Sequence, residues 1–231
     1  MSDKLLHYAI AEGVQAFSTM REAELPYPVL QPHQTHNDKV VVVDNPLITR
    51  ADLEGVDALV TQMPDFAIGV RTADCVPVLL YDAHQRAIAA IHCGWRGTVA
   101  HISQKAILVM QKQFGTQPAD LLAIIGPSIG PDSFQVGVEV VEQFAQANFP
   151  MDFILSDRGT KVAKTMQGGL HIDLWKANQW LLTTAGLRTE NIQTAGICTY
   201  EHNDIFYSAR REGRWCGRII NSIKLISEPS K

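Results

Sequence analysis

Two short apolar segments joined by a polar turn constrain this chain more than any other feature of its sequence. Residues 76–81 (VPVLLY) and 87–92 (AIAAIH) are rich in strand-forming residues, and residues 82–85 lie between them. Apolar runs of this length on either side of a short polar stretch are typical of a β-hairpin. The sequence therefore predicts two antiparallel, hydrogen-bonded strands over residues 76–92.

The register of this hairpin decides which side chains meet at its open end. If Tyr81 pairs with Arg86, Cys75 lies opposite His92, with Cα atoms about 4.5 to 5.5 Å apart. A slip of one residue would separate the two side chains, because successive residues of a strand point to opposite faces. We expect a thiol and an imidazole within reach of each other.

A cysteine beside a histidine supports two kinds of chemistry. The two side chains can share a metal ion, since Zn–S and Zn–N bonds are about 2.3 and 2.0 Å long. Alternatively, His92 can lower the pKa of the thiol and make Cys75 a nucleophile. In a third interpretation there is no chemistry, because an isolated cysteine is most often a small buried apolar residue.

The sequence around this pair is polar or contains glycine. Cys75 and His92 each lie where a strand gives way to a turn, which is where functional residues concentrate. The spacing of apolar residues after Gly97 predicts a helix with Thr98 as its N-cap. The free N–H groups at the start of such a helix, together with Arg96, suit an anion such as phosphate.

A metal site would need a third ligand. Residues 33–38 (HQTHND) offer His33 and His36, which on an extended chain point to opposite sides, so that at most one reaches the hairpin. Composition alone does not choose between them. Asp74, next to Cys75, is either a carboxylate that orients a ligand histidine or a turn residue.

Nine ordered motifs then resemble the YfiH family of laccase-like, or polyphenol oxidase, domains, members of which are described as zinc-containing purine nucleoside phosphorylases. The motifs are FST (17–19), QTH (34–36), DALVT (57–61), TADC (72–75), HCGWRG (92–97), GPSIGP (126–131), DLW (173–175), CT (198–199) and FYSARR (206–211). They run through most of the chain. The chain departs from the family pattern at two places. The loop after Thr19 is shorter, and Arg71 adds positive charge beside the expected site.

The resemblance implies a set of site residues. In the family, the histidine of QTH, the cysteine of TADC and the histidine that opens HCGWRG form the metal and catalytic centre; here these are His36, Cys75 and His92. The resemblance also implies contacts to substrate or phosphate from Arg96, Arg210, Arg211 and Ser208.

The resemblance further implies an activity. Three protein ligands leave one position of a tetrahedral zinc ion open, as catalytic sites do. We expect a zinc-dependent purine nucleoside phosphorylase acting on adenosine, inosine or methylthioadenosine. Family members are also credited with adenosine deamination, for which the ion would activate a water molecule.

Three other functions remain open. A copper polyphenol oxidase is the least favoured, because a multicopper site needs many imidazoles, and the chain has eight histidines and no His-x-His pair. A metal-free hydrolase would use Cys75 as nucleophile and His92 as base on an amide in a cell-wall precursor, without His36. A non-catalytic module would use the metal only to stabilise its fold.

Composition and charge narrow the class of protein. A chain of 231 residues, 46% hydrophobic and without a linker, predicts one domain over residues 1–231. A net charge of −4 gives no general attraction to nucleic acid or anionic membranes, so the expected partners are a small nucleoside and phosphate. The absence of a secretory signal and of an apolar run of about 20 residues predicts a cytoplasmic protein. Its four cysteines show no CxxC spacing, which fits reduced thiols.

Strand-like runs outnumber helical ones in the rest of the sequence. Strands are predicted over residues 5–10, 14–18, 39–43, 66–70, 121–125, 193–198, 205–208 and 218–226. Helices are predicted after Thr98, over residues 138–148, and from an N-cap at Asp173. This pattern favours an α+β fold, and the family resemblance implies a layered α/β/β/α sandwich with mixed sheets.

Overall fold

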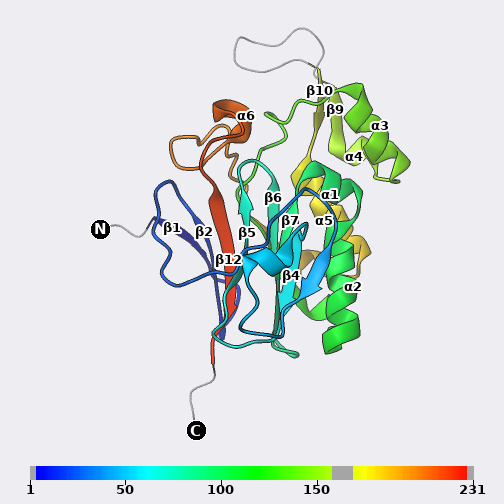
Figure 1. Ribbon diagram of the computed structural model, residues 1–231. Helices are drawn as coiled ribbons and strands as arrows, with labels where there is room; N and C mark the ends of the chain where they lie inside the picture. Colours follow the sequence, from blue (N-terminus) through cyan, green and yellow to red (C-terminus); the bar gives the residue numbers. More distant parts are fainter. Residues whose placement is uncertain (1–3, 158–168, 228–231) are drawn as a thin grey trace.

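A computed structural model describes residues 4–157 and 169–227 and shows two β-sheets packed face to face (Figure 1). The four-stranded sheet is antiparallel and has the order β1 (Leu5–Tyr8), β2 (Val14–Thr19), β12 (Ile219–Leu225), β5 (Ile68–Thr72). The six-stranded sheet is mixed and has the order β11 (Ile192–Thr194), β8 (Leu121–Ile125), β6 (Val76–Asp82), β7 (Ala87–Cys93), β4 (Ala58–Thr61), β3 (Val40–Val42). A separate pair joins β9 (Leu155–Asp157) to β10 (Leu170–Ile172).

Helices cover the outer face of the six-stranded sheet (Figure 1). They are α1 (Trp95–Val99), α2 (Ile102–Phe114) and α5 (Leu174–Thr184). Two further helices, α3 (Val138–Gln146) and α4 (Met151–Ile154), lie beside the β9–β10 pair, and α6 (Ala209–Glu212) precedes β12. Short 3-10 helices span Arg50–Leu53, Pro118–Asp120 and Thr189–Asn191. No helix within residues 4–157 and 169–227 is long and apolar enough to cross a membrane.

Two apolar layers hold these elements together. One lies between the sheets, where Ile68 and Val70 of β5 face Leu79 of β6 and Ile88 of β7. The other lies between the six-stranded sheet and its helices. Strands β6 and β7 are buried along their whole length because they contribute to both layers. The predicted α+β class and layered arrangement are confirmed.

The central hairpin forms, but the predicted register is wrong by two residues. Tyr81 pairs with Ile88 and Pro77 with His92, so Cys75 does not lie directly opposite His92. The strand extends through Asp82, whose carboxylate accepts hydrogen bonds from the N–H groups of His84 and Gln85 and so moves the loop to residues 83–86. Because strand side chains repeat every two residues, a slip of two keeps Cys75 and His92 on the same face.

The helix predicted after Gly97 begins elsewhere. Thr98 is not an N-cap: it is buried inside α1, and its Oγ1 donates to the carbonyl of Cys93. The N-cap of α1 is Gly94, and α2 begins after His101, whose φ of 60° breaks the helical path between them. The expected N-cap at Asp173 is confirmed, since its carboxylate accepts from the N–H of Lys176.

Most other strands form close to their predicted positions, with one exception. Residues 121–125 form β8 as predicted, whereas the strand predicted at 205–208 is wrong. Ile205 and Phe206 turn back to bond the carbonyl of His202, and Ser208 caps α6 by accepting from the N–H of Arg211. A capping serine therefore ends the apolar run before it can pair with another strand.

Candidate metal centre

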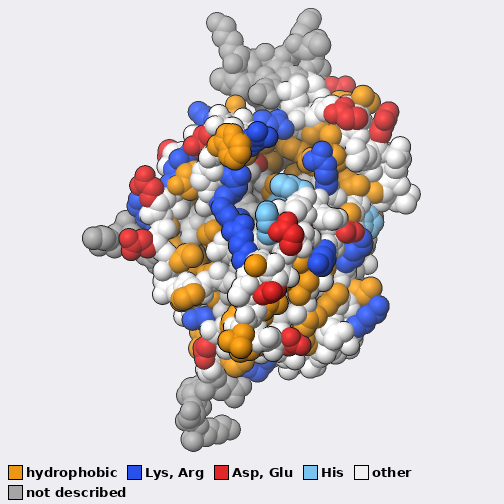
Figure 2. Space-filling model, in the orientation of Figure 1, with side chains coloured by type: hydrophobic (Ala, Val, Ile, Leu, Met, Phe, Trp, Pro, Cys, Tyr) orange, Lys and Arg blue, Asp and Glu red, His pale blue; other side chains and the backbone are white. Residues whose placement is uncertain are grey.

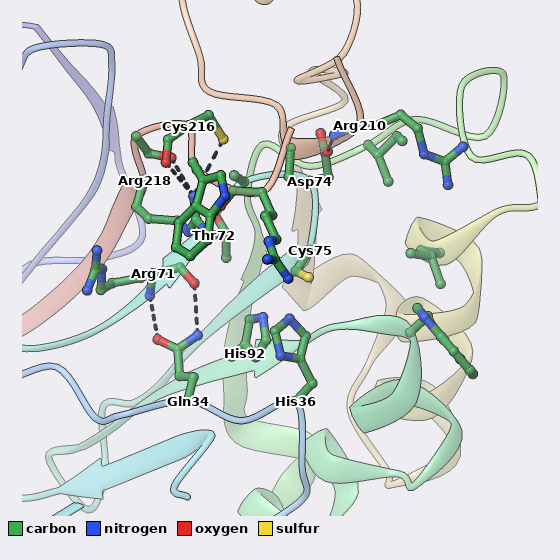
Figure 3. Close-up of a pocket in the computed structure, with 18 of the residues that line it drawn as sticks. Gln34, His36, Arg71, Thr72, Asp74, Cys75, His92, Arg210, Cys216 and Arg218 are labelled. Carbon is green, nitrogen blue, oxygen red and sulfur yellow. Dashed lines mark hydrogen bonds between the residues drawn. The ribbon is translucent and has the colours of Figure 1, made fainter. Parts of the chain in front are cut away.

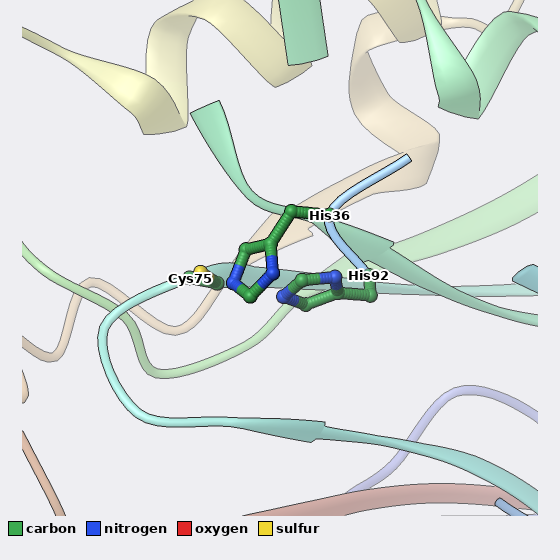
Figure 4. A group of neighbouring side chains, drawn as sticks. All are labelled: His36, Cys75 and His92. Carbon is green, nitrogen blue, oxygen red and sulfur yellow. The ribbon is translucent and has the colours of Figure 1, made fainter. Parts of the chain in front are cut away.

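Three side chains from separate parts of the chain meet at one end of the six-stranded sheet (Figure 4). His36 comes from the loop before β3, Cys75 from the turn between β5 and β6, and His92 from the end of β7. Their ligand atoms all lie within 4.8 Å of one another. The thiol and imidazole that we expected to meet therefore do so, and His36 joins them.

The donor set fits a metal ion such as zinc. Zn–N and Zn–S bonds of about 2.0 and 2.3 Å let donors this close share one ion after small side-chain rotations. His92 is 2% exposed, whereas His36 is exposed, so the group opens to solvent on the His36 side. Within residues 4–157 and 169–227 this is the one group of three or more potential ligands.

A buried carboxylate, Asp57, orients both histidines. Its Oδ1 lies 2.7 Å from Nδ1 of His92, which fixes that nitrogen as the donor and leaves Nε2 free to bind a metal. The same carboxylate accepts hydrogen bonds from the backbone N–H groups of Thr35, His36 and Asn37 at 3.1, 3.0 and 2.9 Å. One side chain thus holds the loop that carries His36 and the ring of His92.

The loop needs this support because His36 is in the left-handed backbone region, with φ of 61°. Residues other than glycine rarely adopt such a conformation without compensating contacts. Gln34 supplies a second anchor: it accepts from the N–H of Arg71 and donates to the carbonyl of Arg71, both at 2.8 Å (Figure 3). In the QTH motif an anchor, Gln34, therefore precedes a candidate metal ligand, His36.

Glycine suits position 94 because the side chains of Cys75, His36 and His92 approach its backbone closely. A Cβ there would lie 3.2 Å from Sγ of Cys75, 3.3 Å from Cδ2 of His36 and 3.4 Å from Cε1 of His92. Any larger residue would therefore push against all three side chains. This explains the glycine that follows the His-Cys pair.

Charges in the metal-free site favour a thiolate and an imidazolium. Burial raises the pKa of Cys75, but the positive charge of His92 and hydrogen bonds with His36 and His92 outweigh it and lower this pKa to about 6. Burial lowers the pKa of His92, but the charge of Cys75 and the hydrogen bond to Asp57 outweigh it and raise this pKa to about 9. Burial also opposes ionisation of Asp57, yet the bond from His92 and the backbone N–H groups hold its pKa below the ordinary value.

Of the two interpretations of Asp74, the turn residue is confirmed, since it lies in the turn between β5 and β6. Its carboxylate accepts from Oγ1 of Thr199 at 2.7 Å and from the N–H of Arg210 at 2.6 Å, and its backbone has φ of 85°. It therefore fixes the turn that carries Cys75 to the loop before α6, and it orients no ligand histidine. The orienting carboxylate is Asp57, which opens the DALVT motif; its role was missed because in the sequence it is a lone acidic residue before a buried strand.

Of the other residues expected at the site, one lines the pocket and three do not. Arg210 lines the pocket around the three ligands. Arg96 is exposed and stacks on the ring of Trp95 at 4.2 Å, Arg211 donates to the carbonyl of Tyr200, and Ser208 is buried as a helix cap. These three do not line the pocket, and their contacts to substrate stay predictions. His33 lies at the pocket edge and pairs with Glu54, so His36 is the histidine that reaches the hairpin.

The pocket that contains the group has a volume of about 860 Å³. Its wall includes the aromatic side chains of Trp95, Phe134 and Trp215. Figure 2 shows histidine side chains in a hollow of the surface, beside a line of basic side chains. The volume lies in the upper part of the range for small-molecule sites, roughly 300–1,000 Å³.

The fold and the site together define a layered α+β protein with one His-Cys-His group at the end of its central hairpin. Residues 9–226 match the family described as "Multi-copper polyphenol oxidoreductase laccase". The chain belongs to this family, the YfiH family that its motifs resemble.

Named relatives and a solved structure agree with this assignment. A "Purine nucleoside phosphorylase" of Bacteroides thetaiotaomicron is 42% identical over 209 residues, which cover 88% of this chain and 75% of the relative. "Adenosine deaminase RL5", from an unknown prokaryotic organism, is 40% identical over 201 residues, 84% of this chain and 74% of the relative. The crystal structure of the hypothetical protein YfiH of Bacillus licheniformis has a TM-score of 0.84 and 23% identity, with 97% of each chain covered, and shares the fold.

Replacing Asp57 by asparagine is expected to weaken metal binding about 10- to 100-fold, because the amide cannot accept from His92 and from three backbone N–H groups at once. Competition with a zinc chelator measures the affinity. Asp44→Asn, which changes an exposed carboxylate, is the control. Equal zinc affinity of the Asp57→Asn variant and the unaltered protein would contradict this role.

Alkylation of the metal-free protein is expected to follow the pKa of Cys75. Reaction with iodoacetamide should rise with pH through a midpoint near 6, because the thiolate is the reactive form. Burial raises the pKa of Cys216, so that thiol should react only at higher pH, and Cys93 and Cys198 are buried. Mass spectrometry of the labelled peptides makes the measurement, and a midpoint for Cys75 above pH 8 would refute the charge assignment.

Proposed function

We propose that the protein is a zinc-dependent purine nucleoside phosphorylase that acts on adenosine, inosine and methylthioadenosine. The observation that carries the proposal is the His36, Cys75 and His92 group, which opens into a pocket large enough for a nucleoside and phosphate. The name of the 42% identical relative supports the same reaction. When bound, zinc would supply a Lewis acid at the end of the hairpin.

In the proposed reaction an oxygen of inorganic phosphate forms a bond to C1′ of the ribose. The bond between C1′ and N9 of the purine breaks, and its electron pair leaves with the base, which takes up the proton that hydrogen phosphate loses as it becomes the ribose 1-phosphate ester. Arg210 offsets the charge of phosphate from the rim, where its Nη1 is held by the carbonyl of Gln135 at 3.2 Å. We assign further contacts to Arg96, Arg211 and Ser208.

Aromatic residues in the pocket wall suit a purine. Trp95 begins α1 beside the ligands, and Phe134 lies below the guanidinium of Arg210 at 5.5 Å. Aromatic rings stack on a flat base at little conformational cost. Tyr207, of the FYSARR motif, instead lies under the guanidinium of Arg21 at 4.4 Å and does not line the pocket.

We prefer zinc to copper because the described residues offer one three-donor group, and a multicopper oxidase needs several. Adenosine deamination is a second candidate, supported by the name of the 40% identical relative. Ammonia release and base release from adenosine, measured in the same sample, separate the two reactions.

Replacing His36 by alanine tests the proposal against a metal-free hydrolase. The Asp57, His92 and Cys75 arrangement has the order of a catalytic triad and would act without His36. If a metal ion drives the reaction, His36→Ala should lose bound zinc and reduce phosphate-dependent base release at least about 100-fold, as Cys75→Ala should. His33→Ala, at the pocket edge, is the control for the loop.

Base release by His36→Ala at near the unaltered rate, with no zinc bound, would overturn the metal-dependent proposal. The absence of base release from all three nucleosides by the zinc-loaded, folded protein would overturn the phosphorylase assignment itself. Stripping the metal should abolish release, and adding zinc back should restore it.

A further inference from the structure

The pocket around the metal ligands has an unbalanced charge. Among the residues that the structure describes, five arginines line it: Arg50, Arg71, Arg210, Arg214 and Arg218. Asp74 is the one carboxylate in the described part of the lining, and it is already bonded to Thr199 and to the backbone of Arg210. Since the chain as a whole carries a charge of −4, this positive field is local to the pocket.

Arg71 lies near two other arginines of the pocket, Arg50 and Arg218. It is half-buried on β5, and Gln34 fixes its backbone from both sides. Burial lowers its pKa, and the nearby positive charges of Arg50 and Arg218 lower it further, because like charges disfavour the charged form. No acidic side chain in the described part of the chain forms an ion pair with any of the three.

Arg50, Arg71 and Arg218 form an arginine cluster in the pocket lining. Backbone carbonyls hold Arg218 in place. Its Nη1 donates to the carbonyls of Cys216 and Gly217 at 2.5 and 2.9 Å, and its Nη2 donates to the carbonyl of Arg214 at 2.9 Å. Like charges held together without counter-ions repel one another, and a bound anion would relieve that repulsion. Arginine is well suited to this because its planar group can bond two oxygens of a phosphate.

The cluster lies apart from the arginine already assigned to inorganic phosphate. Figure 3 places Arg71 and Arg218 on one side of Cys75 and Arg210 on the other. Arg210 reaches the opposite rim, where it bonds the carbonyl of Gln135. The pocket therefore presents two positive regions that flank the metal ligands.

We propose that Arg50, Arg71 and Arg218 form a second phosphate subsite, and that the pocket accepts a nucleoside carrying its own phosphate group. The substrate class is a nucleoside monophosphate. The reaction rests on the proposed function: inorganic phosphate bonds to C1′, the C1′–N9 bond breaks, and the base leaves with a proton. The phosphate group of the substrate stays attached and only binds.

Binding tests the subsite independently of turnover. Calorimetry of the zinc-loaded protein should show that 5′-AMP or 3′-AMP binds more tightly than adenosine. In Arg71→Gln the ratio of nucleotide to adenosine affinity should fall about ten-fold, the effect expected for a lost bond between charged groups. Arg188→Gln, an exposed arginine away from the pocket, is the matched control. Arg50→Gln tests the same cluster from an exposed position if Arg71→Gln fails to fold.

Turnover separates the possible sources of the anion. Phosphate-dependent base release from the bound nucleotide, reduced about ten-fold more than release from adenosine in Arg71→Gln, supports the inference. If Arg71→Gln instead raises KM for inorganic phosphate with adenosine as substrate, and nucleotides bind no better than adenosine, the cluster serves the co-substrate and the inference is overturned. Nucleotide binding that depends on Arg71 without base release from any substrate supports the subsite and overturns the proposed function.

Discussion

The rest of the site depends on the hydrogen bonds that one buried carboxylate, Asp57, accepts. It accepts one hydrogen bond from His92 and three from successive backbone N–H groups of the loop that carries His36. Without it, four donors would lose their partner, and a ligand with a left-handed backbone would lose its support. The carboxylate thereby joins the loop that carries His36 to the buried central hairpin.

The packing of the two sheets fixes the positions of the side chains at this site. Because β6 and β7 are buried on both faces, His92 at the end of β7 and Cys75 just before β6 have little freedom to move apart. Gly94 lets all three ligands approach one backbone position. The same end of the fold gathers arginines around these three side chains, so a protein of net negative charge has a positive pocket that suits an anion.

Local patterns predicted the parts of the structure that local forces decide. The apolar runs around residues 82–85 gave the hairpin, and the carboxylate of Asp173 marked the start of α5. The predicted register was wrong because the carboxylate of Asp82 bonds within its own turn. The predicted N-cap at Thr98 was wrong because this residue is packed inside α1. The choice of His36 over His33 came from family resemblance. Asp57 was missed because its partners are 20 or more residues away along the chain.

A zinc titration of the metal-free protein tests the central claim most directly, with phosphate-dependent release of adenine from adenosine as the readout. The account predicts that release is absent without zinc, rises in proportion to added zinc, and reaches its maximum at one ion per chain, since His36, Cys75 and His92 form a single site. Release that is complete before zinc is added would contradict it. So would a maximum reached only after several ions have bound.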